Sequence, residues 1–186
     1  MSQIKDITEK FYTSISNGEI EVIDSLLSNE FELIVPMENG VLSGHYKGKK
    51  RFMEDVLPLV FSCVNPEEIV FCKDFKIINS FNDTVIAMTQ NDGIALSGKP
   101  YNQIYLHILT IQGGKIIRLI EAFDSSLAND SLWGDSKQLI PDEHFSLKHF
   151  SLKVACLFLN SGWCLSYIPQ KNILLTSLLL NPQTAL

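Results

Sequence analysis

The pair Gly113-Gly114 constrains the fold of this chain more than any other feature of its sequence. It separates two runs rich in isoleucine and leucine, residues 101–112 and 115–124. Two adjacent glycines between such runs favour a β-hairpin, because both positions of a two-residue turn need a positive φ. The sequence therefore predicts an antiparallel hairpin in which residues equally far from the turn face each other.

This register divides the hairpin into an apolar face and a mixed face, since facing residues share a side of the sheet. Glu121 falls on the apolar face, together with Ile104, Leu106, Leu119 and Phe123. His107 falls on the mixed face, opposite Ile120. We therefore expect Glu121 and His107 to point in opposite directions.

A single carboxylate on an apolar face has two interpretations. Glu121 can be structural, at an edge or paired with Arg118 or a backbone donor. It can instead line a dry pocket, where the loss of hydration disfavours the charged carboxylate. Such a carboxyl is a usable general acid or base near neutral pH, and this makes Glu121 the candidate catalytic residue.

The hairpin resembles the C-terminal signature of SnoaL-like proteins in the nuclear transport factor 2-like superfamily, also called the ketosteroid-isomerase-like fold. That signature is an aromatic-rich strand, a turn, Gly-Lys-Ile, and a close of Glu-aromatic-x-Asp or Asn. Here the corresponding segments are residues 101–107 (YNQIYLH), 114–116 (GKI) and 121–124 (EAFD). Their spacing is also similar to that of phenazine-biosynthesis A/B-type proteins, which the resemblance indicates as the nearest relatives.

The first half of the chain is consistent with this resemblance. Residues 3–27 predict two helices broken at Asn17-Gly18, and residues 31–36 predict a short strand. Residues 44–48 (GHYKG) resemble the family's entry into a third helix over residues 49–60, after which residues 68–78 and 83–96 alternate as strands. We expect an α+β fold in which a curved, cone-shaped antiparallel sheet wraps around N-terminal helices. The SnoaL-like domain would cover residues 1–132, and residues 133–186 would form a C-terminal extension of uncertain structure.

The resemblance also places candidate residues around the cone. Besides the catalytic Glu121, the ligand-binding candidates are Tyr12 on the first helix, His45 and Tyr46 at the mouth, and Leu106 and Phe123 in the hairpin. His107 and Asp124 are further candidates, each with a structural role as the alternative.

Composition excludes several classes of function. The net charge is −6, so no basic surface favours nucleic acid. The four cysteines lack paired metal-ligand spacing, and a charged helix begins near Met1, which indicates a reduced cytoplasmic protein without a metal. The resemblance implies no cofactor. The mixed face of the hairpin is too apolar for water, so we expect a homodimer through the sheet.

The last forty-odd residues differ from the rest of the chain, because no Asp or Glu follows Glu143 and leucines are frequent. Neither apolar run reaches the roughly 20 residues of a membrane span. The segment can be an added helix at the sheet or an interface, a membrane-surface or partner-binding segment, or a poorly ordered end. The sequence does not choose among these, and membrane contact is not favoured.

Two functions stay open on the sequence alone. The first is a small-molecule-binding enzyme, a cofactor-independent isomerase, cyclase or dehydratase that uses Glu121 on an apolar cyclic substrate. The second is a non-catalytic ligand-binding or dimerisation module. A hydrogen-bond partner for Glu121 inside an open pocket would favour the first. A cavity filled by side chains, or an arginine paired with Glu121, would favour the second.

Overall fold

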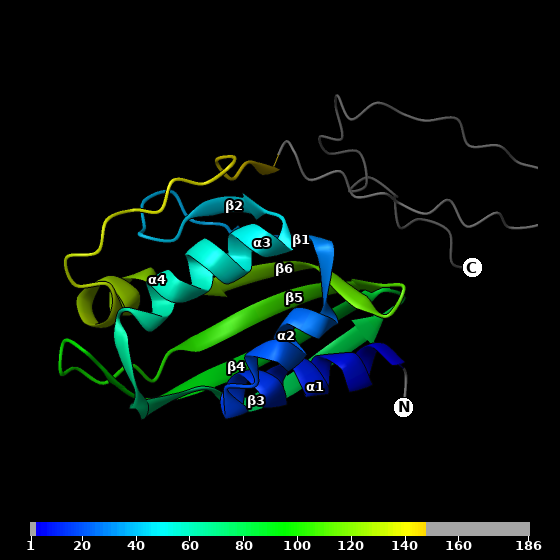
Figure 1. Ribbon diagram of the computed structural model, residues 1–186, viewed down its shortest axis with the longest axis horizontal. Coiled ribbons are helices and arrows are strands. Elements are labelled where there is room, and N and C mark those ends of the chain that lie inside the picture. The colour runs from blue at the N-terminus through cyan, green and yellow to red at the C-terminus, as the bar shows by residue number, and fades with distance from the viewer. Residues whose placement is uncertain (1–2, 148–186) are drawn as a thin grey trace, which may run out of the picture. The chain divides into compact units, whose positions relative to one another are not determined.

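A curved sheet of six strands organises residues 3–147, which are the residues that the computed structural model describes (Figure 1). The strand order is β2-β1-β6-β5-β4-β3. The strands are β1 (Leu27–Val35), β2 (Gly44–Lys47), β3 (Val64–Phe81), β4 (Thr84–Ala95), β5 (Ile104–Gln112) and β6 (Lys115–Phe123). The predicted α+β class with a curved sheet is confirmed.

Two helices precede the first strand, as the sequence predicts. Helix α1 (Gln3–Asn17) buries Phe11 and Tyr12. It ends before Gly18, whose φ of +70° suits the left-handed backbone that commonly terminates a helix. Helix α2 (Ile20–Leu26) follows directly and leads into β1.

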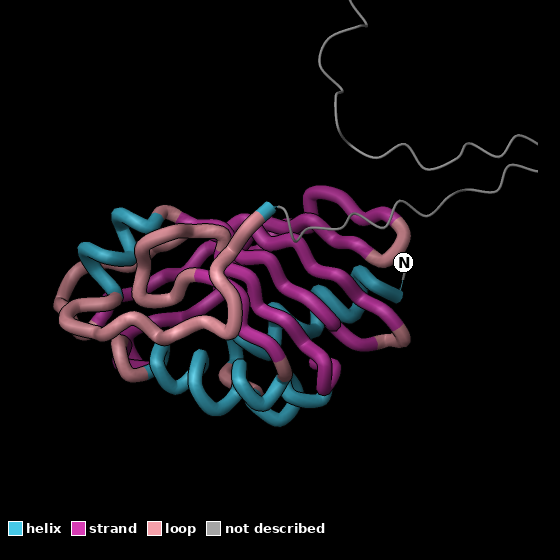
Figure 2. Tube along the Cα trace, turned by 90° about the horizontal axis from the view of Figure 1, so that it is seen from above, coloured by secondary structure: helices cyan, strands magenta, loops and turns pink. Residues whose placement is uncertain are grey.

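The third helical stretch is divided into α3 (Lys49–Arg51), a π-helical turn η1 (Phe52–Val56) and α4 (Leu57–Phe61). Pro58 near the start of α4 has no N–H to donate to a carbonyl one turn earlier. The helix changes to the wider π-helical hydrogen bonding in the turn just before it. Helices α1 to α4 lie on one face of the sheet, as two views at right angles show (Figures 1 and 2). Short helical turns α5 (Ser125–Leu127) and η2 (Ala128–Leu132) follow β6.

The sheet is mixed rather than wholly antiparallel, which corrects the expectation from sequence. Strand β1 runs parallel to β6, with Leu33 opposite Leu119 and Ile34 opposite Ile120, while the other neighbours are antiparallel. No hairpin turn joins β1 to β6, so their direction follows from the path of the chain between them. Local turn signals predict only the antiparallel pairs.

The hairpin itself is present, but its register differs from the prediction. Gly113 and Gly114 have φ values of +57° and +78° and form the expected turn. Ile111 faces Ile116, whereas Thr110 faces Arg118, so Ile117 is an extra residue in β6. This β-bulge shifts every later pair by one residue, so Tyr105, His107 and Leu109 of β5, rather than Leu106 and its neighbours, share the inner face with Glu121 of β6.

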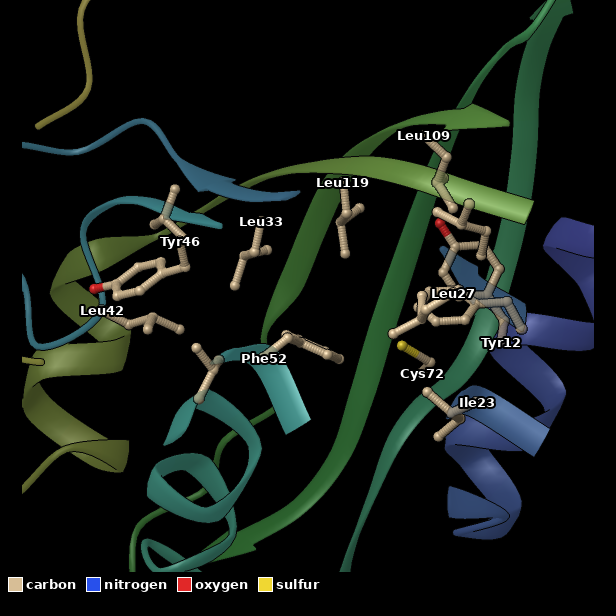
Figure 3. Close-up of a cluster of buried hydrophobic side chains, with 14 of the residues drawn as sticks. Tyr12, Ile23, Leu27, Leu33, Leu42, Tyr46, Phe52, Cys72, Leu109 and Leu119 are labelled. Carbon is tan, nitrogen blue, oxygen red and sulfur yellow. The ribbon is translucent and has the colours of Figure 1, made fainter. Parts of the chain in front are cut away.

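The inner face of the sheet and the helices enclose the core. Leu33 and Leu119 extend from the strands toward the helical side that carries Phe52 (Figure 3). After Leu132 the chain continues along β2, where Trp133 is buried and the N–H of Leu139 donates to the carbonyl of Val41 at 2.8 Å.

Two further expectations concern the end of the chain and the membrane. Residues 148–186, which hold the apolar C-terminal runs, lie outside the described residues. Within residues 3–147, no helix is long and apolar enough to cross a membrane.

Candidate active site

A cavity of about 350 Å³ lies between the inner face of the sheet and the helices. Its wall is mostly apolar and includes Phe11, Phe52, Leu119, Phe123 and Trp133. Small-molecule sites in proteins commonly have volumes of about 300–1,000 Å³ and a few polar groups on an apolar wall. Its polar side chains include those of Cys72, Asn91, Tyr101, Tyr105, His107 and Glu121, and Ser16 and Asn17 at the end of α1 also line it.

His107 and Glu121 form a pair across strands β5 and β6, directly opposite each other in the sheet. His107 Nε2 lies 3.1 Å from Glu121 Oε2, and the two side chains are 4% and 19% exposed. The bulge at Ile117 creates this pair, because it brings both residues to the inner face. The expectation that they point in opposite directions is therefore wrong.

Tyr12 holds the other side of the imidazole. Its hydroxyl lies 3.1 Å from His107 Nδ1, and burial raises the pKa of this phenol above its ordinary value of 10.0. A phenol that keeps its proton donates to Nδ1, which leaves the ring proton on Nε2, where it is donated to Glu121. Tyr12 thus fixes the tautomer of His107 from behind, while its neighbour Phe11 lines the cavity.

This chain of hydrogen bonds holds one carboxylate oxygen of Glu121 and leaves the other without a hydrogen-bond partner among residues 3–147. Glu121 also lines the cavity, where no Lys, Arg or Asp of the described chain accompanies it. A carboxylate that is oriented on one oxygen and unpaired on the other can accept a proton from a molecule in the cavity.

A second polar group lies on the same wall. The hydroxyls of Tyr101 and Tyr105 are 2.9 Å apart, and Asn91 Nδ2 lies 3.4 Å from the Tyr105 hydroxyl. Burial raises the pKa of both phenols above 10.0, and the nearby Glu121 acts in the same direction. Both tyrosines therefore stay protonated at neutral pH.

Cys72 lies beside this group at an irregular position in β3. Its φ of +50° belongs to a bulge between Val70 and Asp74, and its N–H donates to Asn91 Oδ1 at 3.0 Å. Burial raises the pKa of the Cys72 thiol to about 12, so it is a thiol rather than a thiolate nucleophile.

The structure separates the predicted site residues into two groups. Glu121, His107 and Phe123 line the cavity, with Tyr12 directly behind them. Leu106 does not line it: the bulge places this residue on the outer face, where it is 43% exposed.

His45, Tyr46 and Asp124 have structural contacts away from the cavity. The imidazole of His45 lies between two carboxylates, with Nε2 3.6 Å from Glu32 and Nδ1 3.7 Å from Glu143. The backbone N–H of His45 donates to the backbone carbonyl of Glu143. The Tyr46 hydroxyl is 3.0 Å from the carbonyl of Leu139. Asp124 caps α5 by accepting from the N–H groups of residues 126 and 127 at 2.8 and 3.2 Å.

Sequence reasoning missed Tyr101, Tyr105, Asn91 and Cys72 as wall residues. A usable signal was present for the tyrosines, because the side chains at positions 101, 105 and 107 share a face in an extended chain. No comparable signal exists for Cys72, whose position depends on the β3 bulge. Within residues 3–147, no group of three or more His, Cys, Asp or Glu side chains is arranged to hold a metal ion.

Comparison with known proteins identifies the fold. No protein-family model matches the sequence, and no curated protein sequence matches it. Solved structures do match. An NTF2-like protein of unknown function from Burkholderia pseudomallei has 15% identity and a TM-score of 0.61, covering 71% of this chain and 98% of its own.

Two further structures carry chemical information in their descriptions. TerC, co-crystallised with polyporic acid, has 18% identity and a TM-score of 0.59 over 70% of this chain and 98% of its own. A proposed polyketide cyclase from Pseudomonas putida has 16% identity and a TM-score of 0.57 over 71% and 98%. At such identities the likeness shows the fold. The described part of the chain has the nuclear transport factor 2-like fold, and a closer relation to phenazine-biosynthesis proteins stays a prediction.

Proposed function

We propose that the cavity binds a neutral, apolar small molecule and that Glu121, oriented by His107, transfers a proton on it without a cofactor. The observation that carries this proposal is the 3.1 Å pair of His107 and Glu121 on the wall of a mostly apolar cavity. Proton transfer by a positioned carboxylate typically contributes about 10²–10⁴-fold to a rate.

The features that distinguish the two functions support the enzyme. The partner of Glu121 is His107, which holds one carboxylate oxygen, rather than an arginine, which would pair with the carboxylate as a permanent cation. The cavity is not filled by side chains, because about 350 Å³ stays open. TerC, whose structure is similar to that of this chain, was co-crystallised with a small molecule, polyporic acid.

The reaction class follows from one base in an apolar site. Glu121 takes a proton from a carbon beside a carbonyl, and the electron pair of that C–H bond moves onto the carbonyl oxygen. Return of the proton to another carbon completes an isomerisation. In a dehydration, the electron pair moves back from the oxygen, a hydroxyl leaves the next carbon, and it takes the proton from Glu121 and departs as water. Attack of the activated carbon on a second carbonyl closes a ring, and the oxygen of that carbonyl becomes a hydroxyl by taking the proton from Glu121.

A panel of cyclic ketones in D₂O tests this proposal, because exchange of a hydrogen beside the carbonyl reports proton abstraction without knowledge of the natural substrate. We expect 1-tetralone to exchange faster with the protein, and Glu121→Gln to slow the catalysed exchange by about 100-fold or more. Glu9→Gln on the exposed face of α1 is the matched control and should exchange at the wild-type rate.

The outcome also separates the alternative function. Exchange that is equally fast in Glu121→Gln would contradict a role for this carboxylate. Ketone binding by the wild-type protein without any exchange would support the non-catalytic binding module instead.

A further inference from the structure

Part of the cavity wall is exposed to solvent, so the cavity reaches the surface of the protein. Among the side chains that line it, Phe61 is 39% exposed and Val70 is 37% exposed. A side chain that lines a cavity and is exposed to this degree lies where the cavity opens. With Pro66 and Phe71 of β3, which also line the cavity, these residues form what we call the apolar rim.

Helix α4 carries apolar side chains that the fold itself does not bury. Its sequence is LPLVF, and none of its five residues is buried. Leu57, Val60 and Phe61 of this helix line the cavity. Apolar side chains gain free energy when they lose their contact with water, and in a filled core a neighbouring element would cover them. Here the open space of about 350 Å³ takes the place of that neighbour.

The two aromatic rings of the apolar rim are packed edge to face. The centroids of Phe61 and Phe71 are 6.1 Å apart, and their planes are inclined by 79°. This favourable arrangement links the end of α4 to β3. Because the rim residues and Glu121 line the same cavity, an apolar surface extends from the mouth to the inner face of the sheet.

The charges near the mouth disfavour an anionic occupant. Glu67 and Glu68 are exposed and lie between Pro66 and Val70 of the rim in the sequence of β3. Within residues 3–147, no Lys or Arg lines the cavity. Like charges repel each other, and no cation on the wall offsets this repulsion. The exposed apolar surface of the mouth therefore suits an uncharged group.

We propose that the ligand of this cavity is elongated, with its reactive head at Glu121 and an uncharged hydrocarbon tail in the mouth, against Phe61 and Val70. Phe61 then determines which tail is accepted, because it lies at the end of α4 where the cavity opens. This inference rests on the proposed function for the head of the ligand. It adds the part that reaches the surface and covers the apolar side chains that the fold leaves exposed.

A series of 4′-alkylacetophenones with tails from methyl to hexyl tests the inference on the full chain. The aromatic ketone stays the same throughout the series, and only the length of the tail changes. Titration calorimetry measures the affinity of each member. We expect each methylene that enters the mouth to tighten binding about twofold to fourfold.

A substitution at the rim should affect the long tail alone. We expect Phe61→Ser to weaken binding of the hexyl ketone about tenfold, with the methyl ketone bound as by the wild-type protein. Phe81→Ser is the matched control, because Phe81 is 72% exposed at the far end of β3 and does not line the cavity. This control should bind every member of the series with wild-type affinity.

A measurement on the wild-type protein keeps the test decisive if Phe61→Ser does not fold. In the complex with the hexyl ketone, the terminal methyl group should show a nuclear Overhauser effect to the ring protons of Phe61 or Phe71. A terminal methyl without contact to either ring would overturn the inference. Equal affinity for all tail lengths would overturn it too, as would an equal effect of Phe61→Ser on the methyl and hexyl ketones.

This inference and the proton transfer fail separately. Binding that tightens with tail length, by ketones whose neighbouring hydrogens do not exchange, would leave the inference standing and refute the proton transfer. Exchange that depends on Glu121, with an affinity that is independent of tail length, would do the reverse. A series in which no member binds would contradict both.

Discussion

Replacing Tyr12 by phenylalanine removes a single oxygen atom from the network behind Glu121. The ring keeps its contacts, because its centroid lies 5.7 Å from that of His107 and 5.1 Å from that of Phe75. The lost bond is the 3.1 Å contact to His107 Nδ1. The substitution therefore isolates the hydrogen bond from the packing.

The size of the effect follows from burial. Tyr12 is fully buried and His107 is 3% exposed, so water does not replace the lost donor. A buried acceptor left without a partner costs about 1–3 kcal/mol. Moving the ring proton to Nδ1 does not relieve this cost, because Nε2 would then face the Glu121 carboxylate without a proton.

Urea unfolding followed by tryptophan fluorescence measures the cost. We expect Tyr12→Phe to lower the free energy of unfolding by about 1–3 kcal/mol. The urea concentration at the midpoint should fall, while the slope of the free energy against urea concentration should stay the same. The ¹⁵N shifts of the imidazole should show an Nε2–H tautomer in the wild-type protein and a mixture in the variant. Unchanged stability together with an unchanged tautomer would refute the role of Tyr12 in fixing the imidazole.

Three further predictions concern other parts of the described chain. The Cys72 thiol, with a pKa of about 12, should react with iodoacetamide at pH 8 far more slowly than a free cysteine, because almost none of it is thiolate, and rapid labelling located by mass spectrometry would contradict the raised pKa. Burial lowers the pKa of His45 below 6.5, so the unfolded chain binds this proton more tightly and stability falls as the pH drops through 6.5; His45→Gln should lose this part of the pH dependence, and an unchanged pH profile would count against it. The residues through which the homodimer was predicted, among them Tyr105, His107 and Leu109, are buried on the inner face, so that surface is not available to a second chain. The outer face instead exposes Met88, Ile104 and Leu106 side by side on β4 and β5; if a homodimer forms through this face, Leu106→Glu should halve the mass measured by light scattering, and a wild-type monomer would refute the dimer.

The elements that the sequence predicts well have signals in neighbouring residues. Gly113-Gly114 forms its turn and Gly18 separates the first two helices because glycine adopts positive φ without strain. The third helix is found from its glycine-containing entry and its length. In each case a few adjacent residues carry the information.

The register of the hairpin could not be predicted in the same way. Ile117 is one isoleucine among several, and nothing in its neighbours indicates that it bulges. Both faces of the hairpin carry apolar residues, so hydrophobic alternation does not decide which one is buried. A one-residue shift was enough to separate His107 from Glu121 in the prediction and to exchange Leu106 for Tyr105 on the inner face.

The roles of His45, Tyr46 and Asp124 depend on contacts that no local pattern specifies. His45 and Tyr46 contact residues 139–143, almost a hundred positions later in the chain. Asp124 ends β6 as the cap of α5, a use that its motif position did not distinguish from ligand binding. Glu121 was recognised because a lone carboxylate among apolar residues is unusual whichever face it occupies.

A crystal structure of the full chain with 1-tetralone tests the proposed site most directly. We expect the ketone inside the cavity that Glu121 lines. The carbon beside the carbonyl should lie within about 3.5 Å of the Glu121 carboxylate. A ketone bound on the outer face of the sheet, or one in the cavity with its reactive carbon turned away from Glu121, would contradict the proton transfer.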